Sequence, residues 1–292
     1  MSERPKLKLG FTDYYDTLDG FFLNALEPHF EIERDDANPD YLIFCDETYG
    51  TNNRQYDPNK VVKIFFTGEN RRPWNYQSHY AISFEHGDHR NWYRLPLYVL
   101  DNWVNTELLD LPDFTTKRMM TKDDLESRVN FCTFVAGNGG CERRNNAFHM
   151  VNEYKKVSSG GPLFNNIGHT IPRGSDAQIH KLDFLQTGKF HLCYENGSYP
   201  GYVTEKIAHA FAANTIPIYW GSPTVEMDFN PDAFINRHNY ETDEQMMEAV
   251  RFIDEFDDAW LTMVNEPVLA DNNFTMDLDR FARWFKRVVF KG

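Results

Sequence analysis

The sequence lacks an excess of positive charge and any long apolar run. Among its 292 residues, 44 are acidic and 30 are Lys or Arg, which gives a formal net charge of −14. This charge argues against a general nucleic-acid binder or a protein that coats anionic membranes. No stretch approaches the ~18 apolar residues of a membrane-spanning helix, and the N-terminus has no apolar signal-peptide core. We therefore expect a cytoplasmic protein.

Cysteine is scarce, and its spacing predicts neither a disulfide framework nor a zinc site. The four cysteines, Cys45, Cys132, Cys141 and Cys193, form no CxxC pair and no zinc-type pattern with histidine. Three lie in or beside apolar runs, where cysteine acts as a small buried hydrophobic residue. Reduced thiols are the expectation. The acidic stretch 46–57 lacks the ligand spacing of a calcium loop, and no DxD motif stands at a strand end, so the sequence predicts no metal site.

What the sequence does contain is a series of short apolar runs separated by helical patterns. The runs do not alternate cleanly, which is typical of parallel strands covered on both faces. Helical spacing of apolar residues recurs between them, and this order of strands and helices predicts an α/β fold. The expected strands are 7–11, 41–46, 61–66, 131–136, 190–195 and 216–221, and the expected helices include 145–156, 243–256 and 278–290.

The chain divides into two α/β halves at a polar connector. Residues 109–128 are charged and contain a proline, which suits a linker. We expect an N-terminal domain over 1–127, a second domain over 128–275, and a C-terminal helix over 276–292 that packs on either half. Two such domains with a cleft between them are a common arrangement in enzymes that join two substrates.

One segment, YPGYVTEKIAHAFAANTIPIYWGS (199–222), carries the first chemical signal. A turn leads into a helix that we expect to begin at Glu205, with Thr204 as N-cap and Asn214 as C-cap. Lys206 then lies in the first turn, where a cation is unfavourable for the helix but suits an anionic ligand. The alternative is an ordinary solvent-exposed Glu-Lys pair.

The segment also resembles a known family. FHLCYENGSYPGYVTEKIAHAFAANTIPIYWG (190–221) is similar to the signature of the α-1,3-fucosyltransferases, glycosyltransferase family 10. NFCTFVAGNGGCERRNNAF (130–148), KKVSSGGPLFNNIG (155–168), IFFTGENRRPWNY (64–76) and WYRLPLYV (92–99) resemble further family segments, the third of them in bacterial members. The resemblance spans residues 61–240.

The resemblance implies a GT-B fold, in which two Rossmann-like domains face an inter-domain cleft. It implies an inverting transferase that moves L-fucose from GDP-β-L-fucose to the 3-hydroxyl of N-acetylglucosamine in LacNAc-type acceptors, giving a Lewis X type product. GDP-fucose would bind the C-terminal domain and the acceptor the N-terminal domain. No cofactor is required by this scheme, and stimulation by Mn²⁺ is left open.

The resemblance also assigns donor-binding residues. Lys206 would face the diphosphate, and Glu205 would bind a ribose or fucose hydroxyl. Arg144 is our first choice for a second phosphate-binding cation and Arg143 our second, because the loop before them is one residue longer than in bacterial members. Three further donor-site residues, with structural roles as the alternative, are Glu195, Asn196 and Tyr202.

On the acceptor side, Glu69 is the candidate general base, because it follows a buried strand at its carboxyl end. Glu85 and Asp88 are weaker candidates for that role. Three aromatic side chains could contact a sugar or could instead belong to the core: Trp74, His86 and Trp92.

Alternatives for the donor, the linkage, the acceptor and the activity itself stay open. The donor could be another nucleotide sugar, the linkage α-1,4, or the chain a catalytically inactive carbohydrate-binding relative. The acceptor could be a type 1 or type 2 chain, free or in lipopolysaccharide. Membrane contact, at the inner face of the cytoplasmic membrane, would involve only the amphipathic C-terminal helix, although packing of that helix on the core is favoured. The oligomeric state is open.

Overall fold

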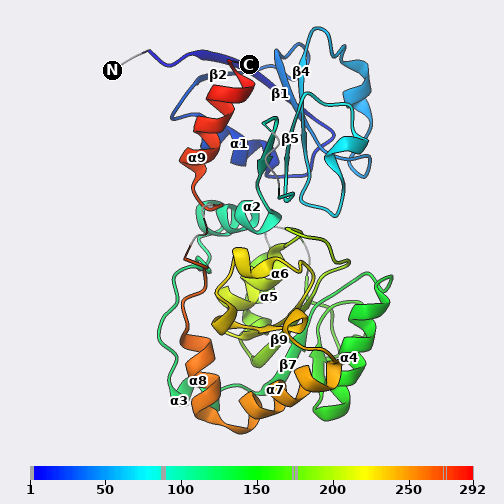
Figure 1. Cartoon of the computed structure of the whole chain (residues 1–292), viewed down its shortest axis with the longest axis vertical. Coiled ribbons are helices and arrows are strands. Elements are labelled where there is room, and N and C mark those ends of the chain that lie inside the picture. The colour runs from blue at the N-terminus through cyan, green and yellow to red at the C-terminus, as the bar shows by residue number, and fades with distance from the viewer. Residues whose placement is uncertain are drawn as a thin grey trace. The chain divides into compact units, whose positions relative to one another are not determined.

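The chain folds into two compact units, each built on a parallel sheet. The structure, a computed structural model, describes residues 3–86, 90–172, 174, 177–271, 273 and 275–291. One unit comprises Met1–Trp103 with Phe274–Gly292, and the other Val104–Asn273. We call them unit 1 and unit 2. Figure 1 shows both, with the chain coloured from blue at the N-terminus to red at the C-terminus.

The sheet of unit 1 has the strand order β2-β1-β3-β4-β5-β6, and neighbouring strands pair in parallel. The inner strands β1, β3, β4 and β5 carry runs of buried side chains, as expected for a sheet covered on both faces. Their bounds are β1 Lys6–Thr12, β2 Glu31–Arg34, β3 Tyr41–Phe44, β4 Val62–Phe66, β5 Tyr80–Ser83 and β6 Trp92–Arg94. Helices α1 (Leu18–Leu26) and α2 (Leu97–Trp103) belong to the same unit.

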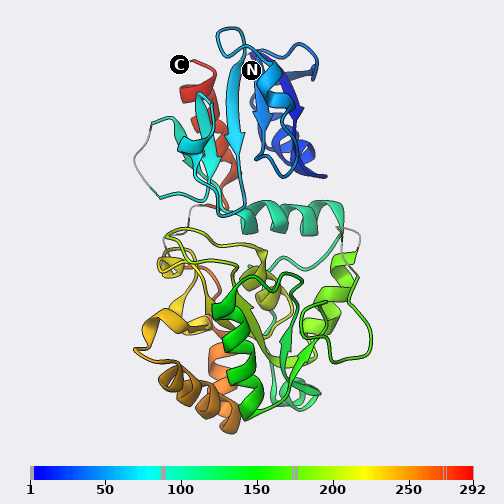
Figure 2. The ribbon, with the colours of Figure 1, turned by 90° about the vertical axis from the view of Figure 1, so that its right-hand side faces the viewer.

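The C-terminal helix is part of unit 1. Helix α9 (Leu278–Trp284) continues into a π-helical turn, Phe285–Val289, and contacts α1, beside which it is drawn in Figure 1; Figure 2 shows the same helix in red from a second side. The ring of Phe281 packs 5.7 Å from Phe22 of α1 and 5.2 Å from Tyr93, measured between centroids. The apolar face of this helix is therefore buried in the core, and residues 276–292 are not a separate segment.

The sheet of unit 2 has the order β11-β10-β9-β7-β8, again with parallel pairing. Alternate residues of β9 face opposite sides: Phe190 and Leu192 join the main core with α4, α7 and α8, whereas the thiol of Cys193 contacts the start of α6. The strands are β7 Asn130–Phe134, β8 Val157–Ser159, β9 Gly188–Tyr194, β10 Ile216–Trp220 and β11 Ile235–Asn236. The helices are α3 Lys122–Glu126, α4 Glu142–Tyr154, α5 Gln178–Leu185, α6 Glu205–Ala212, α7 Asp243–Glu255 and α8 Asp257–Asn265.

The boundary between the units differs from the expected one. It falls between Trp103 and Val104 rather than near residue 128. The polar connector is less solvated than its composition suggests, because Phe114 is buried, and Met120 and Leu125 join the core of unit 2. A few anchoring apolar side chains thus assign this stretch to unit 2.

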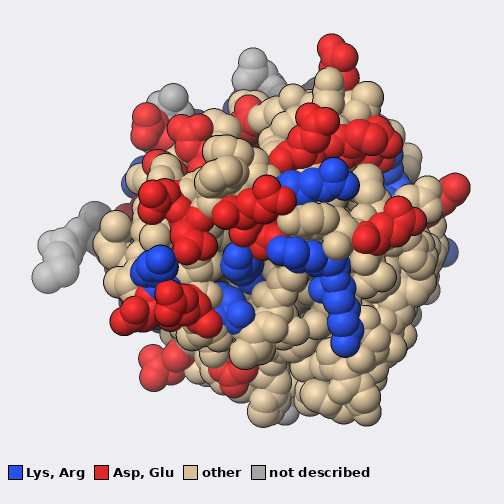
Figure 3. Space-filling view, turned by 90° about the horizontal axis from the view of Figure 1, so that it is seen from below, with Lys and Arg blue, Asp and Glu red and all other residues tan. Residues whose placement is uncertain are grey.

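The acidic character of the chain is visible on the end of unit 2 that lies lowest in Figure 1. Figure 3 views this end and shows acidic side chains spread across it, with basic side chains among them. The exposed acids of α7 and α8 are Glu244, Glu248, Glu255, Asp257 and Asp258. A binding site for an anion in this unit therefore needs several Lys or Arg side chains close together, because the net negative charge of the chain repels anions.

Candidate functional site

The centre of the site in unit 2 is a buried carboxylate at the carboxyl end of β9. Glu195 is 0% exposed and accepts hydrogen bonds from the backbone N–H of Thr204 (2.8 Å), the Thr204 hydroxyl (2.8 Å) and the Lys206 ammonium (2.8 Å). The loop 196–203 leaves β9 and returns to α6. Glu195 therefore fastens the far end of this loop to the strand on which it starts.

The backbone next to Glu195 is close-packed, and this explains a glycine. A Cβ atom on Gly221 would lie 2.4 Å from Cγ of Glu195 and 2.6 Å from the hydroxyl oxygen of Tyr219. Only glycine allows the end of β10 to approach Glu195 this closely. The Tyr219 hydroxyl in turn accepts a hydrogen bond from the backbone N–H of Ser222 (2.9 Å).

Helix α6 begins at Glu205, as predicted, but the expected caps differ. Thr204 occupies the N-cap position, yet its side chain makes no capping hydrogen bond: the hydroxyl donates to Glu195, and its oxygen accepts from the Lys206 ammonium (2.8 Å) instead of from a backbone N–H. The C-cap is Ala213, and Asn214 follows it with a φ of 49°, a left-handed conformation that asparagine tolerates. The first turn of α6 thus has no side-chain cap from Thr204, which leaves its N–H groups to another partner.

Lys206 is held beside two carboxylates. Its Nζ lies 2.8 Å from Glu195 Oε2 and 3.8 Å from Glu205 Oε1, and its side chain remains 21% exposed. Burial disfavours the charged form of Lys206, but the Glu195 and Glu205 carboxylates outweigh this effect and hold its pKa above the ordinary value. The ammonium group is therefore charged at neutral pH and fixed in position.

Glu205 lies between two cations. Its Oε1 is 3.7 Å from Nζ of Lys181, on α5, and 3.8 Å from Nζ of Lys206. Burial alone would raise the pKa of the Glu205 carboxyl, but the Coulombic attraction of Lys206 and Lys181 lowers it well below the ordinary value. Sequence analysis missed Lys181, since it lies 24 positions before Glu205 with no motif around it.

The two arginines of α4 differ sharply in their partners. Arg143 forms a bidentate ion pair with Asp243, at 3.0 and 2.5 Å. Arg144 is 3% exposed and donates to the backbone carbonyl of Asn138, and its Nε is a buried donor with no partner among the described residues. The charge of Arg144 also lowers the pKa of Lys206, against the larger effects of burial and the carboxylates, so the two cations are near one another.

Two more predicted residues meet in the loop between β9 and α6. Tyr202 is buried, and its hydroxyl donates a hydrogen bond to Oδ1 of Asn196 at 2.9 Å. Asn196 is exposed at the start of the loop. The structure therefore brings together Glu195, Asn196, Tyr202, Glu205 and Lys206 in one segment, with Arg144 nearby.

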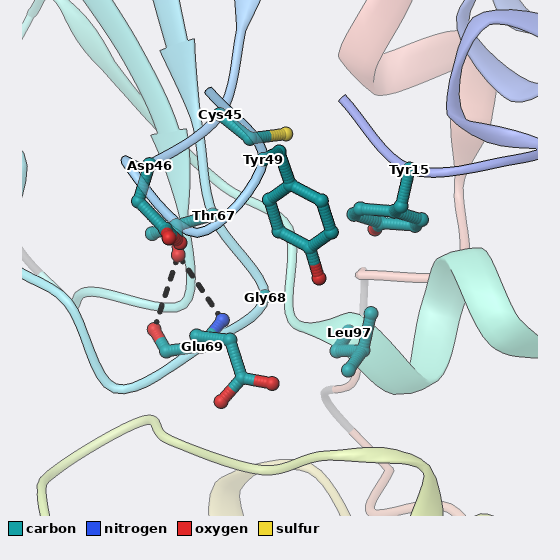
Figure 4. Close-up of a pocket in the computed structure, with 8 residues that line it drawn as sticks. All are labelled: Tyr15, Cys45, Asp46, Tyr49, Thr67, Gly68, Glu69 and Leu97. Carbon is teal, nitrogen blue, oxygen red and sulfur yellow. Dashed lines mark hydrogen bonds between the residues drawn. The ribbon is translucent and has the colours of Figure 1, made fainter. Parts of the chain in front are cut away.

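In unit 1, Glu69 lies three residues beyond the end of β4, at its carboxyl end as predicted. The Thr67 hydroxyl accepts a hydrogen bond from the Glu69 N–H (3.1 Å) and donates to the Glu69 carbonyl (3.2 Å), so the turn is fixed. Figure 4 shows these bonds and the Glu69 side chain beside Leu97 and Tyr49. The Glu69 side chain is exposed and borders a cavity.

The other acceptor-side candidates are in less favourable or untested positions. Glu85 is 8% exposed and lies 3.7 Å from the Arg72 guanidinium, which makes it a poorer base. Asp88 lies outside the described residues. Trp74 is 59% exposed and stacks on Trp92, with ring centroids 6.0 Å apart. His86 is partly buried at the end of the described segment 3–86.

Several expectations concern metals, thiols and membranes. Cys45, Cys132 and Cys193 are buried thiols, as predicted, and Cys141 is partly exposed. Among the described residues, no cluster of three or more His, Cys, Asp or Glu side chains is arranged to hold a metal ion. Within that same part of the chain, the helices are too short or too polar to cross a bilayer.

Comparison with protein families assigns both halves of the chain. Residues 9–101 match the α-(1,3)-fucosyltransferase FucT N-terminal domain, and residues 125–265 match the C-terminal model of glycosyltransferase family 10, the fucosyltransferases. The chain belongs to glycosyltransferase family 10. The two matches together cover most of its length, and both compact units of this family member are included.

Known relatives agree with this assignment. The family 10 chain is 31% identical over 254 residues to the α-(1,3)-fucosyltransferase FucT of Helicobacter pylori, a match that covers 78% of this chain and 50% of the relative. A putative fucosyltransferase of Acanthamoeba polyphaga mimivirus is 28% identical over 167 residues, covering 55% of this chain and 28% of the relative. The chain thus spans about half the length, or less, of these curated relatives.

Solved structures share the fold. A crystal structure of an α1,3-fucosyltransferase matches with a TM-score of 0.79 and 26% identity, covering 99% of this chain and 92% of that one. A crystal structure of α1,3-fucosyltransferase with GDP-fucose matches with a TM-score of 0.75 and 25% identity over the same shares. The prediction of an α/β fold of GT-B type is confirmed.

Proposed function

We propose that this chain transfers L-fucose from GDP-β-L-fucose to the 3-hydroxyl of N-acetylglucosamine in LacNAc-type acceptors, with inversion at the anomeric carbon. The observation that supports this most is the fixed pair of cations, Lys206 and Arg144, at the carboxyl end of the sheet in unit 2. Ligands of open α/β sheets bind at this edge. Family membership and the solved relative with GDP-fucose support the choice of donor.

In the proposed donor site, the two cations act on the leaving group. The bond between the anomeric carbon and the β-phosphate oxygen breaks, and GDP leaves with the electron pair. Lys206 and Arg144 stabilise the negative charge that develops on that oxygen, an effect of ~3–4 kcal/mol in comparable sites. The orphaned Nε of Arg144 supplies a donor for a phosphate oxygen. Arg143 is already engaged by Asp243, so it is the weaker candidate.

Other residues of the loop have supporting roles in this proposal. Glu205 accepts hydrogen bonds from ribose or fucose hydroxyls, and Tyr202 places Asn196 at the donor through their hydrogen bond of 2.9 Å. Glu195 positions Lys206 rather than touching the donor. We propose that no metal or other cofactor is required, because Lys206 and Arg144 supply the positive charge that a metal ion would otherwise bring to the diphosphate.

In the proposed acceptor site, Glu69 is the general base. Its carboxylate takes the proton from the acceptor 3-hydroxyl while the oxygen of that group bonds to the anomeric carbon opposite GDP. Unit 1 would bind the acceptor and unit 2 the donor. The exposed face of Trp74 offers a stacking surface for sugar C–H groups, supported by Trp92 beneath it. The role of His86 stays a prediction.

The product and its place in the cell are finer parts of this proposal. A LacNAc acceptor gives a Lewis X type product, on a free oligosaccharide or on lipopolysaccharide. We place the enzyme in the cytoplasm or at the inner face of the membrane, where exposed cations would contact anionic lipid: Arg280 and Arg283 of α9, and Arg287 of the π-helical turn that follows it.

A direct assay tests the function. The protein is incubated with GDP-fucose and, in parallel, type 1, type 2 and lactose acceptors; GDP release is measured and the product linkage is determined by NMR. The proposal predicts α-1,3 linkage on the type 2 chain. An α-1,4 product on the type 1 chain would favour the alternative linkage. GDP binding without turnover on any of these acceptors would favour an inactive carbohydrate-binding relative.

A further inference from the structure

A small cavity opens beside the proposed base, and the mechanism above does not use it. It has a volume of about 110 Å³ and is lined entirely by residues of unit 1. Figure 4 shows the lining side chains, which come from three strand ends and from the start of α2. They are Tyr15, Cys45, Asp46, Tyr49, Thr67, Gly68, Glu69 and Leu97.

One tyrosine hydroxyl at this cavity is buried and unsatisfied. The Tyr15 hydroxyl is a buried polar atom without a hydrogen bond among the described residues, whereas Tyr49, which also lines the cavity, is 38% exposed. The two rings are in contact, with centroids 5.2 Å apart. An unsatisfied buried hydroxyl is costly, so an orphan at a cavity wall points to a ligand that supplies the missing partner.

Both hydroxyls keep their protons at neutral pH. Burial, with smaller effects from Cys45 and Tyr49, raises the pKa of Tyr15 well above its ordinary value. Burial and the nearby Glu69 carboxylate raise the pKa of Tyr49 to about 12. They are therefore hydrogen-bond donors, and they suit a neutral acceptor such as a carbonyl oxygen better than a cation.

The rest of the wall is largely apolar. The Leu97 side chain closes one side, and it lies so close to Gly68 that a Cβ on this glycine would come within 2.7 Å of Leu97 Cδ1. The Cys45 thiol is buried, and the ring of Tyr15 packs 6.4 Å from that of Phe66. A ligand for this cavity thus combines a small apolar end with a carbonyl oxygen.

We propose that this cavity binds the 2-acetamido group of the acceptor N-acetylglucosamine, with the carbonyl accepting from Tyr15 or Tyr49 and the methyl packing on Leu97. This inference rests on the proposed function. It follows from acceptor chemistry: the 2-acetamido group and the 3-hydroxyl are on adjacent carbons. When Glu69 takes the proton of the 3-hydroxyl, the acetamido group must lie immediately beside Glu69, where the cavity is.

The polarity of the cavity distinguishes this group from the other neighbour of the 3-hydroxyl. On the measure used for its ~110 Å³, one water needs ~10–15 Å³, so the cavity has room for the heavy atoms of an acetamido group. The galactosyl group on carbon 4 of a type 2 acceptor is a whole hexose that carries several hydroxyls. The largely apolar wall offers few hydrogen-bond partners for these hydroxyls.

The first test compares two acceptors that differ only at carbon 2, LacNAc and lactose, using the full chain. We expect the wild type to prefer LacNAc by ~10–100-fold in kcat/KM. Tyr15→Phe should lower kcat/KM for LacNAc by ~2–10-fold, mainly through KM, and change that for lactose by less than about twofold. Because the Tyr15 hydroxyl is unsatisfied without ligand, this variant should not lower the Tm. The matched control is Tyr56→Phe, because the Tyr56 hydroxyl donates to the Asp36 backbone carbonyl and does not face the cavity. This variant should leave the LacNAc/lactose ratio of kcat/KM unchanged.

The second test alters the size of the cavity. Leu97→Ala should accept an acceptor with an N-butanoyl group in place of N-acetyl, raising its kcat/KM relative to LacNAc by ~10-fold or more over the wild type. The control is Leu100→Ala, the same change on the same helix at a buried position that does not line the cavity, and it should leave this preference unchanged. The KM for GDP-fucose should not change in any of these variants.

The outcomes are separable. If the LacNAc/lactose ratio is the same in the wild type and Tyr15→Phe, and Leu97→Ala gains nothing for N-butanoyl, the cavity does not bind the acetamido group even though fucosyl transfer occurs. If the changes appear in the KM for GDP-fucose, the cavity serves the donor and the inference is wrong. If the wild type transfers to neither acceptor, the proposed function itself fails.

Discussion

Removal of the Lys206 side chain should reduce both activity and stability, for separate reasons. In Lys206→Ala the proposed leaving group loses a fixed cation, so kcat/KM for GDP-fucose should fall by ~10²–10³-fold. The buried carboxylate of Glu195 also loses its ionic partner at 2.8 Å. Both effects reduce the measured rate, and a single variant cannot separate them.

The stability cost can be bounded from the contacts. Removing one partner of a buried ion pair typically costs ~3–5 kcal/mol. Here the Lys206 side chain is 21% exposed, and Glu195 keeps hydrogen bonds from the N–H and hydroxyl of Thr204. We therefore expect ~1–3 kcal/mol less free energy of unfolding, which leaves the protein folded at 25 °C.

A double variant separates the two effects. The double variant Glu195→Gln/Lys206→Ala removes the Glu195 carboxylate that Lys206→Ala alone leaves without its ionic partner. Its free energy of unfolding, measured in urea, should therefore be higher than the wild-type value minus the losses of the two single variants. Its transfer activity should stay as low as that of Lys206→Ala. Lys189→Ala is the matched control: Lys189 is also 21% exposed and pairs at 3.1 Å with the buried Asp254, but at the other end of β9. It should lose stability and keep kcat. Recovery of activity in the double variant, or unchanged kcat/KM in Lys206→Ala, would refute the reasoning.

Three further predictions follow from the same contacts. Arg144→Ala should raise the KM for GDP-fucose and lower kcat more than Arg143→Ala, whose side chain is tied to Asp243; the reverse order in steady-state kinetics would identify Arg143 as the phosphate ligand. Glu69→Gln should lower kcat by at least ~10²-fold while calorimetry finds GDP affinity nearly intact; near-wild-type transfer would exclude Glu69 as the base. The lowered pKa of Glu205 means that its charged form stabilises the folded state above the ordinary pKa of 4.5, and that this contribution is lost as pH falls below 4.5 toward the folded pKa. The stability difference between wild type and Glu205→Gln, measured by urea unfolding, should therefore shrink below that pH; a constant difference would contradict the assignment.

The sequence predicted the buried strands well because their signal is local. Six apolar runs predicted strands, and each overlaps one strand of the structure: β1, β3, β4, β7, β9 or β10. Strands β2, β5, β6, β8 and β11 gave no such signal, although β5 lies inside its sheet. β2 and β8 are four and three residues long, and the side chains of β2 are mostly exposed, so their backbone pairing rather than their composition defines them. The position of Glu69 was predictable for the same reason as the strands, since it follows one of the apolar runs.

The contacts of the site were harder to predict than its members. The motif around Glu205 and Lys206 identified the right segment. The capping hydrogen bond predicted for the Thr204 side chain was wrong, because its hydroxyl bonds Glu195 instead. Whether a hydroxyl caps a helix or bonds a carboxylate depends on which segments pack together in the tertiary structure. Here Gly221 packs closely on the Glu195 side chain. The cavity beside Glu69 was also invisible, because its wall comes from segments separated by up to 82 positions, between Tyr15 and Leu97.

The charges around α6 explain why an acidic chain places a lysine in the first turn of a helix. Lys206 alone would be unfavourable at the positive end of the helix dipole. Glu195 and Glu205 offset that cost and keep the ammonium charged, but these two carboxylates alone would also cancel Lys206 and Lys181. The nearby guanidinium of Arg144 gives the cluster its one excess positive charge. In the proposed donor site, a diphosphate therefore meets an excess of positive charge only when Arg144 is present, so Arg144→Ala should weaken GDP binding even though Lys206 stays in place.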